Sequence, residues 1–356
     1  NALATQAGQT YPDKHFVTTE GPRGPNTITK YSTLFFFEGD TISILTRGKT
    51  GAKCELLVNE IHSTPIQSVQ NNTGSLVQIT YIFPDTLRKL IRLNMNSDFY
   101  FGGVIPDSDG RISKVNKKNR TKVALIMDSY GKGTGSSDAI LTGFACRMEK
   151  MLRYGYEFSF SALGGTGYVS TGNGKINYLD STRLSQFEWF KPDIIWIIGS
   201  VNDNHHLTAI KDSAAIGYAR AKNMYPHADI WVTTAFPLAP PYSTGILANT
   251  DSVYSLVTND SDVTVVHTPA WDAMTFSVSS DGVHPDNRGH EKIAEYLINS
   301  FQTNFPSAIY YSSDSTIEKV ITCDNYDWNI KSQLLRTSGR YSSILRLKVW
   351  KSKTMR

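Results

Sequence analysis

The sequence has few cysteines and no long apolar run. Its three cysteines, Cys54, Cys146 and Cys323, lie far apart in a chain of 356 residues. They match neither the CxxC spacing of zinc sites nor the even count of a disulfide framework. No apolar stretch approaches the roughly 20 residues that a membrane-spanning helix needs. We therefore expect a soluble protein without a membrane span, and we predict neither a metal site nor a cofactor.

Charge is also sparse. Charged residues make up 19% of the chain and hydrophobic residues 40%, a composition typical of soluble globular proteins. The net charge is only +4, yet every charged residue after Asp327 is basic. A basic end of this kind is more often solvated, or packed on a neighbouring subunit, than bound to nucleic acid. Nucleic acid is therefore not an expected partner.

The chain divides into segments of different pattern. Residues 1–32 are rich in Gly, Pro and Thr and predict an irregular lead-in. Over 33–115, short apolar stretches alternate with turn residues, which predicts a small antiparallel β-sandwich as an accessory domain. The polar, turn-rich stretch 106–120 is the expected linker. Residues 305–356 fit no clear pattern and form a C-terminal extension of uncertain structure.

From 121 to 304, strand and helix patterns alternate. Short apolar runs such as KVALIM (122–127) and DIIWIIG (193–199) suit strands that are buried on both faces. Helix-like stretches, among them 212–223 and 286–303, separate or follow these runs. This alternation predicts an α/β domain: a doubly wound parallel sheet in three α/β/α layers.

Polar residues and glycines follow the strands of this predicted sheet. Ser129 follows the first strand in MDSYG, and the second strand ends in the glycine-rich GGTGY. The third strand runs into GSVND, which contains Asn202, and DGVHP, with Asp281 and His284, precedes the last helix. The carboxyl ends of parallel strands meet at one edge of a sheet, so one crevice can collect all four motifs.

These residue types suit acyl transfer. A serine hydroxyl becomes a good nucleophile when an imidazole takes its proton, and a carboxylate then fixes the tautomer of that imidazole. Asp281 and His284, three residues apart, supply the carboxylate and the imidazole for Ser129. The oxyanion of the tetrahedral intermediate needs preorganised donors. The N–H of Ser129, the N–H of a glycine in the second turn and the amide of Asn202 can provide them.

This order of motifs resembles the SGNH (GDSL-like) hydrolase superfamily, which is named for its Ser, Gly, Asn and His. The resemblance covers about 121–303 and implies a flavodoxin-like sheet with Ser129 as nucleophile, paired with His284 and Asp281. It also implies an oxyanion hole made by Ser129, a turn glycine and Asn202. By offset Gly167 is the favoured glycine, with Gly165 as the alternative. One departure is Met127, where the family usually has glycine.

The accessory domain adds to this resemblance, because several two-domain carbohydrate O-acetyl esterases carry an N-terminal β-sandwich. The expected substrate is therefore a short-chain ester, an O-acetyl group of a polysaccharide or another small acetyl ester. The polar segment STGNGKINYLDSTR, residues 170–183, offers no apolar groove for a long acyl chain. Tyr130, Tyr168 and His205 are candidates for substrate contacts. Burial in the core is the alternative for the two tyrosines, and a plain loop position is the alternative for the histidine.

Two other interpretations stay open at this stage. The irregular lead-in, the β-rich first half and the basic end also suit a structural or receptor-binding component of a virion or surface assembly. Such a component would form a homo-oligomer or take part in a larger virion or surface assembly. In either role, we expect the protein outside the cell or on a virion or cell surface. The other interpretation is an acyltransferase, because an alcohol can resolve an acyl-enzyme in place of water.

Overall fold

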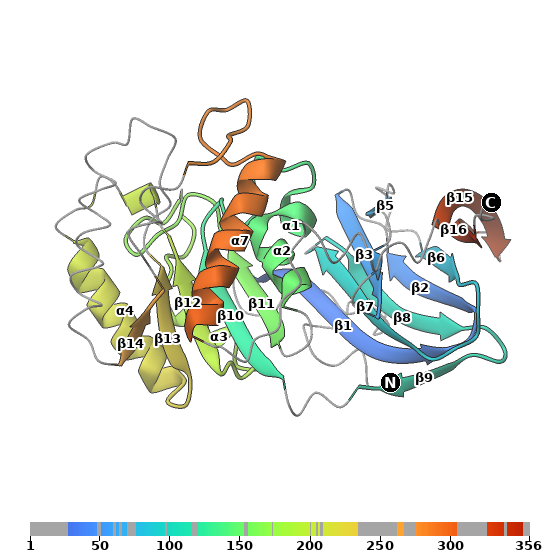
Figure 1. The fold of residues 1–356 in the computed structure, drawn as a ribbon, viewed down its shortest axis with the longest axis horizontal. Helices are drawn as coiled ribbons and strands as arrows, with labels where there is room; N and C mark the ends of the chain where they lie inside the picture. Colours follow the sequence, from blue (N-terminus) through green and yellow to red (C-terminus); the bar gives the residue numbers. More distant parts are fainter. Residues whose placement is uncertain are drawn as a thin grey trace. The chain divides into compact units, whose positions relative to one another are not determined.

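The structure is a computed structural model, and its chain forms two compact units (Figure 1). The β unit comprises Asn1–Arg23, Tyr31–Lys118 and Tyr311–Arg356, and the α/β unit comprises Gly24–Lys30 and Asn119–Tyr310. The residues that the structure describes are 28–47, 51–59, 62–63, 66–69, 76–96, 98–115, 120–152, 156–172, 174–199, 201–203, 206, 209–233, 262–266, 275–304, 326–337 and 340–351.

The β unit contains two groups of paired strands. One group has the order β15-β16-β6-β2-β8, and the other runs β1-β7-β3-β4, with β5 on β3 and β9 on β1. The bounds are β1 Ile28–Glu38, β2 Thr41–Arg47, β3 Ala52–Val58, β4 His62–Ser63, β5 Gln67–Val69, β6 Leu76–Ile82, β7 Lys89–Asn96, β8 Tyr100–Pro106, β9 Arg111–Lys114, β15 Tyr326–Thr337 and β16 Arg340–Lys351. Side chains of both groups meet in the interior, where Cys54 Sγ of β3 lies 3.8 Å from Tyr81 Oη of β6.

Strands β15 and β16 lie in the segment 305–356, whose structure could not be predicted from its sequence pattern. They form an antiparallel hairpin, and β16 also pairs in parallel with β6. The C-terminal segment therefore adds two strands to the β unit. Parallel β16–β6 pairing joins residues more than 200 positions apart, and local sequence patterns carry no information on such pairings.

The α/β unit is built on five parallel strands in the order β14-β13-β12-β10-β11. These strands are β10 Thr121–Met127, β11 Tyr156–Ala162, β12 Ile194–Ile198, β13 Asp229–Thr233 and β14 Val263–Val265. Read from β11, the order is the 2-1-3-4-5 arrangement of flavodoxin-like sheets, as the sequence predicted. The carboxyl ends of β10 and β12, the two central neighbours, carry Ser129 and Asn202.

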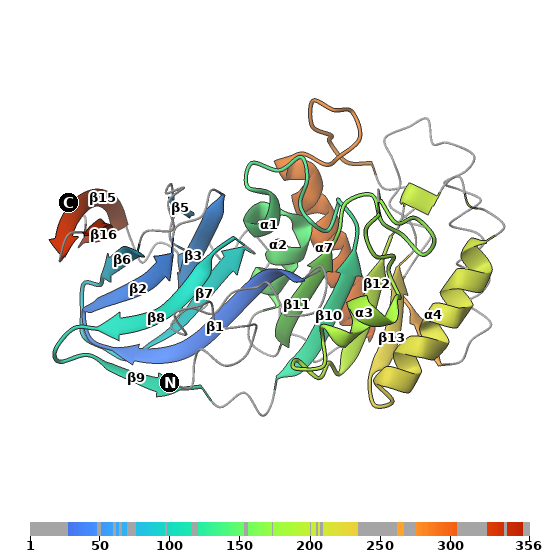
Figure 2. The same cartoon turned by 180° about the vertical axis from the view of Figure 1, so that it is seen from behind.

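Helices cover both faces of this sheet. Helices α1, α2 and α7 lie on the face turned to the viewer in Figure 1, and α3 and α4 lie on the face seen in Figure 2. The bounds are α1 Ala139–Thr142, α2 Phe144–Met151, α3 Ser181–Ser185, α4 Ile210–Met224 and α7 Asn287–Asn304. Alternate residues of β10 point to opposite faces, so Val123, Leu125 and Met127 pack with α2 and α7 in one core.

Two local features affect how the sheet is covered. The segment after Ser137 forms two helices, α1 and α2, because Gly143 adopts an extended conformation between them. Strand β1 begins at Ile28, so the prediction of an irregular lead-in over 1–32 was wrong for residues 28–32. Ile28 and Lys30 pair antiparallel with β11. Lys30 forms a buried ion pair with Glu149 of α2, a partner 119 residues away.

In the part of the chain that the structure describes, no helix is long and apolar enough to cross a membrane.

Candidate active site

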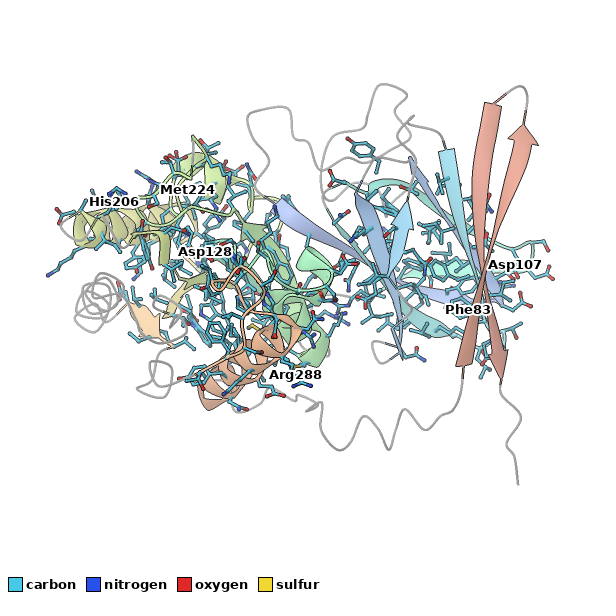
Figure 3. The ribbon with its side chains drawn as sticks, turned by 90° about the horizontal axis from the view of Figure 1, so that it is seen from above. Phe83, Asp107, Asp128, His206, Met224 and Arg288 are labelled. Atoms are coloured by element: carbon cyan, nitrogen blue, oxygen red, sulfur yellow. The ribbon has the colours of Figure 1, made fainter. Side chains whose placement is uncertain are left out.

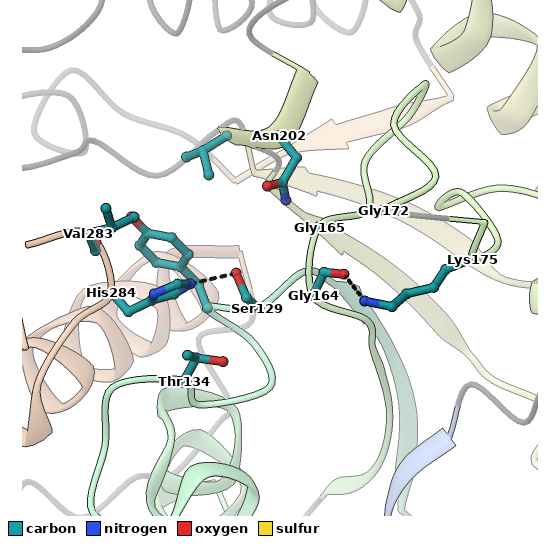
Figure 4. Close-up of a pocket in the computed structure, with 11 residues that line it drawn as sticks. Ser129, Thr134, Gly164, Gly165, Gly172, Lys175, Asn202, Val283 and His284 are labelled. Atoms are coloured by element: carbon teal, nitrogen blue, oxygen red, sulfur yellow. Dashed lines mark hydrogen bonds between the residues drawn. The ribbon is translucent and has the colours of Figure 1, made fainter. Parts of the chain in front are cut away.

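Ser129, His284 and Asp281 form a continuous hydrogen-bonded chain. Ser129 Oγ lies 2.9 Å from His284 Nε2, and His284 Nδ1 lies 2.7 Å from Asp281 Oδ2 (Figure 4). Ser129 follows β10, whereas Asp281 and His284 lie on the loop before α7. His284 is 155 residues after Ser129 in the sequence. The structure thus brings together the three residues that the sequence singled out as nucleophile, base and carboxylate.

The loop of Asp281 holds this carboxylate in its ionised form. Backbone N–H groups of Val283 and His284 each donate to Asp281 Oδ1 at 2.9 Å, and Ser279 Oγ donates to the same oxygen at 2.9 Å. These bonds, the two from the backbone first, lower the pKa of Asp281 below its usual value. An ionised carboxylate only accepts hydrogen bonds, so the proton of the imidazole resides on Nδ1. The lone pair of Nε2 then faces the Ser129 hydroxyl.

The turn that carries Ser129 is fixed by buried groups on both sides. The fully buried carboxylate of Asp128 accepts a hydrogen bond from the N–H of Tyr130 at 2.9 Å. Met127, which departs from the glycine of the resembled family, is also fully buried. Gly131 makes room for it, because a Cβ at Gly131 would lie 2.2 Å from the Cβ of Met127. In this chain the glycine that allows a tight turn therefore follows Ser129, at position 131, instead of preceding it at position 127.

The glycine-rich turn after β11 separates the two candidate oxyanion glycines. The N–H of Gly167 donates to the carbonyl of Ser170 at 2.9 Å, and a Cβ there would meet the Asp203 carboxylate at 2.2 Å. Gly165 instead lines the pocket and has a φ of +79°. The N–H of Gly167, the glycine that the sequence favoured, thus already has an acceptor within the turn. Of the two glycines, Gly165 is the one that lines the pocket, which favours it as the candidate oxyanion donor.

Two backbone N–H groups are candidate donors to an oxyanion. Among the described residues, neither the N–H of Ser129 nor that of Gly165 has a hydrogen-bond acceptor. Asn202, which follows β12, lines the same pocket. Its side-chain nitrogen donates to the carbonyl of Thr166 at 3.0 Å and makes a longer contact of 3.3 Å with Asp128 Oδ2. Ser129, Gly165 and Asn202 thus present donors from three different strand ends.

Asp203 and Arg183 support this glycine turn from within the protein. The buried carboxylate of Asp203 accepts hydrogen bonds from the N–H groups of Tyr168, Val169 and Ser170 at 2.7, 3.2 and 2.8 Å. Arg183 is fully buried and donates to the carbonyl of Met127 at 2.7 Å and to the hydroxyl of Thr166 at 3.1 Å. Burial lowers the pKa of this guanidinium to about 10.

Sequence reasoning missed Arg183 because its signal is not local. It also bonds the side chain and the carbonyl of Ser161, both at 2.8 Å, and so joins the ends of β10 and β11 to the glycine turn. Arg183 ends the polar segment 170–183, and an arginine in such a segment suggests a solvent-exposed charge. Only the fold shows that the side chain turns inward.

His290 is a second residue that the sequence did not reveal. It lies on α7, and its Nε2 donates to the carbonyl of Thr134 at 3.0 Å, while its Nδ1 accepts from the N–H of Phe144 at 3.3 Å. Thr134 lines the pocket and donates its own N–H to the carbonyl of Ser129 at 3.1 Å. The buried imidazole therefore supports the loop that follows Ser129.

The candidates for substrate contacts end up in different places. Tyr130 lines the pocket but is fully buried, and its hydroxyl donates to the carbonyl of Val283 at 2.8 Å. Its ring centroid lies 5.4 Å from that of His284, so it braces the imidazole. Tyr168 is buried with its hydroxyl 2.8 Å from that of Tyr218, and it is not part of the pocket lining. His205 lies outside the described residues.

The site opens into a cavity of about 420 Å³. Besides Ser129, His284 and the donors, its lining includes the apolar side chains of Val201 and Val283 and the ammonium-bearing side chain of Lys175. Figure 3 shows that Asp128, the fully buried residue next to Ser129 in the sequence, lies among the side chains of the α/β unit. The described residues contain no group of three or more His, Cys, Asp or Glu that could hold a metal ion.

No protein-family model matches the sequence, and no curated protein matches it. Solved structures do. A family two carbohydrate esterase from Clostridium thermocellum, in complex with cellohexaose, has a TM-score of 0.63 at 17% identity, covering 78% of this chain and 94% of its own. The acetyl xylan esterase Est2A from Butyrivibrio proteoclasticus has a TM-score of 0.59 at 14% identity, covering 77% of this chain and 90% of its own. The salicylyl-acyltransferase SsfX3 from a tetracycline biosynthetic pathway has a TM-score of 0.55 at 10% identity, covering 78% and 83%.

These likenesses extend over more than three quarters of the chain. At 17% identity or less they establish the fold. The chain therefore has the fold of the family two carbohydrate esterases, and the predicted doubly wound α/β architecture with an additional β-rich domain is confirmed.

Proposed function

We propose that this chain is a serine esterase that hydrolyses short acyl esters, acetyl esters on a carbohydrate above all, through an acyl-enzyme on Ser129. The observation that carries the proposal is the unbroken hydrogen-bond chain from Ser129 Oγ through His284 to Asp281, with distances of 2.9 and 2.7 Å. Such a chain raises the nucleophilicity of a hydroxyl at neutral pH.

Each step of the reaction has a residue for it. Ser129 Oγ forms a bond to the ester carbonyl carbon while His284 Nε2 takes the hydroxyl proton. The protonated imidazole then gives this proton to the leaving alkoxide, so the alcohol departs and the acyl group remains on Ser129. Water then loses a proton to His284 and attacks the acyl carbon, and the bond from this carbon to Ser129 Oγ breaks. The imidazolium returns the proton to Ser129 Oγ as the acid leaves. Throughout, Asp281 stabilises the imidazolium and keeps its Nδ1–H in place.

The negative charge of each tetrahedral intermediate needs preorganised donors. The N–H groups of Ser129 and Gly165 and the amide of Asn202 line the pocket beside the nucleophile. The contact of 3.3 Å between Asn202 and Asp128 is long, so a substrate oxyanion can replace Asp128 as acceptor of that hydrogen. Losing one oxyanion donor commonly costs on the order of a hundredfold in rate.

The acetyl and carbohydrate parts of the proposal rest on fold likeness and on the polar segment 170–183. Carbohydrate esterases with the same fold include one named as an acetyl xylan esterase and one in complex with cellohexaose. The apolar side chains of the pocket lining, Val201 and Val283, are short. They offer a surface for a small acyl group rather than a groove for a long one.

Hydrolysis of 4-nitrophenyl acetate and 4-nitrophenyl dodecanoate by the wild type and by Ser129→Ala tests the proposal. We expect turnover of the acetate, at least tenfold less turnover of the dodecanoate, and a fall of about 10⁴-fold or more in Ser129→Ala. Release of acetate from an acetylated polysaccharide then extends the result to the carbohydrate. Equal activity of Ser129→Ala and wild type would refute the assignment of the nucleophile.

The fold likeness to an acyltransferase supports a second candidate function, transfer of the acyl group to an alcohol. The same acyl-enzyme serves both reactions, so the products distinguish them: an ester of an added acceptor indicates transfer, and free acid alone indicates hydrolysis. A role in a virion or surface assembly stays a prediction. A defined homo-oligomer or particle by light scattering would favour it, and a monomer would count against it.

A further inference from the structure

We propose that Lys175 is a positioning residue of the oxyanion hole: its ammonium group holds the peptide unit between Gly164 and Gly165 so that the Gly165 N–H faces the reacting ester. This inference rests on the proposed esterase function and concerns the same site. Lys175 Nζ donates to the carbonyl oxygen of Gly164 at 2.6 Å (Figure 4).

The geometry of the peptide unit links this contact to the oxyanion. A peptide bond is planar and trans, so its C=O and N–H point in opposite directions. When Lys175 holds the Gly164 oxygen on one side, the N–H of Gly165 must point to the other. Gly164 itself lies against the nucleophile, since a Cβ there would be 3.4 Å from the Cβ of Ser129. The free N–H is thereby presented beside Ser129.

The orientation of this peptide unit needs a contact from another residue, because glycine alone does not fix it. Gly165 has a φ of +79°, and glycine adopts other values of φ at similar energy. The turn that carries Lys175 packs directly on the peptide: a Cβ on Gly172 would lie 2.9 Å from the Gly164 oxygen. Lys175 closes this turn with its own N–H, which donates to the carbonyl of Thr171 at 2.6 Å.

Charge adds a second effect. Lys175 is the only lysine or arginine in the described pocket lining, and no carboxylate among the described residues pairs with it. A cation on the carbonyl oxygen polarises the peptide and makes its N–H a stronger donor. This effect grows as negative charge develops on the substrate, so it favours the transition state over the ground state.

Three variants test the proposal: Lys175→Met removes the donor and its charge, Lys175→Arg keeps both, and Lys211→Met changes an exposed lysine of α4 as a matched control. With neutral methyl 4-acetoxybenzoate we expect Lys175→Met to lower kcat roughly tenfold, below the hundredfold typical of deleting an oxyanion donor. KM should change by less than about twofold, because positioning acts on the transition state. Lys175→Arg should recover most of kcat, and Lys211→Met should match the wild type.

The affinity for methylboronic acid, measured by calorimetry, gives a readout that needs no turnover, because a boronate forms a tetrahedral anion on a serine. We expect this affinity to fall in Lys175→Met by the same factor as kcat. Unchanged kcat and unchanged boronate affinity in a folded Lys175→Met variant would overturn the proposal. So would a loss that appears in KM and only with the anionic substrate 4-acetoxybenzoate, since Lys175 would then contact the charge of the substrate.

Failure of the esterase function is recognised separately. A wild type that hydrolyses no ester, or that loses nothing in Ser129→Ala, removes the function. The boronate titration still tells whether Lys175 supports an anion-binding site.

Discussion

Lowering the pH from 7.5 to 4.5 should destabilise the α/β unit through His290. This side chain is fully buried on α7, and its two ring nitrogens bond the carbonyl of Thr134 and the N–H of Phe144. Both contacts need the neutral ring with its proton on Nε2. Burial, with a smaller contribution from the charge of Arg147, lowers the pKa of His290 from 6.5 to about 4, against the opposing hydrogen bond to Thr134.

The size of the effect follows from that shift. A lowered pKa means that the unfolded chain binds the proton first, so the contribution is complete above pH 6.5 and is lost as the pH falls toward 4. Two and a half units correspond to about 3 kcal/mol in total, of which about 1.4 is lost by pH 5.5 and about 2.5 by pH 4.5.

Urea denaturation of the wild type and of His290→Asn at pH 7.5, 5.5 and 4.5 measures this loss. The asparagine retains one donor and one acceptor but does not titrate. Other groups contribute equally to both proteins, so the gap between them should shrink by about 2.5 kcal/mol between pH 7.5 and 4.5. Parallel pH profiles of the two proteins would refute the assigned burial of a neutral imidazole.

Two further predictions concern the site. Asp281→Asn should lower kcat roughly a hundredfold or more with little change in KM, because an amide can hold His284 in the wrong tautomer. Steady-state kinetics on an aryl acetate measures this fall in kcat. A fall of less than about threefold would contradict the role of the carboxylate. Arg183→Met should lower the free energy of unfolding by about 3–5 kcal/mol, because buried carbonyls at the ends of β10 and β11 lose charged donors. Urea denaturation measures it, and a change below about 1 kcal/mol would show that water or rearrangement replaces those bonds.

The parallel sheet and the meeting of Ser129, His284 and Asp281 could be predicted from sequence because their signals are local. Each buried strand reads as a short apolar run, and each motif follows its strand directly. DGVHP contains base and carboxylate three residues apart, so their pairing needs only one turn of chain. The order of the motifs along the chain then indicated one site.

The choice between Gly165 and Gly167 shows where local patterns stop. Glycines occupy 164, 165 and 167, and all satisfy the same motif. The decision depends on which N–H already has an acceptor, and the acceptor of Gly167 is the carbonyl of Ser170. Such hydrogen bonds depend on how segments pack that are separated in the sequence, and the same is true of the inward orientation of the Arg183 side chain.

The antiparallel start of β1 makes the α/β unit discontinuous in sequence. Cutting the chain at the linker of 106–120 yields a piece that has every residue of the triad but lacks Lys30. The edge of β11 then has unpaired backbone groups, which invite pairing with another copy and aggregation. Glu149, at 1% exposure, also loses its ion pair with Lys30, and breaking a buried pair commonly costs about 3–5 kcal/mol. The α/β unit therefore depends for its solubility on a short segment that is synthesised about ninety residues before the first strand of its parallel sheet.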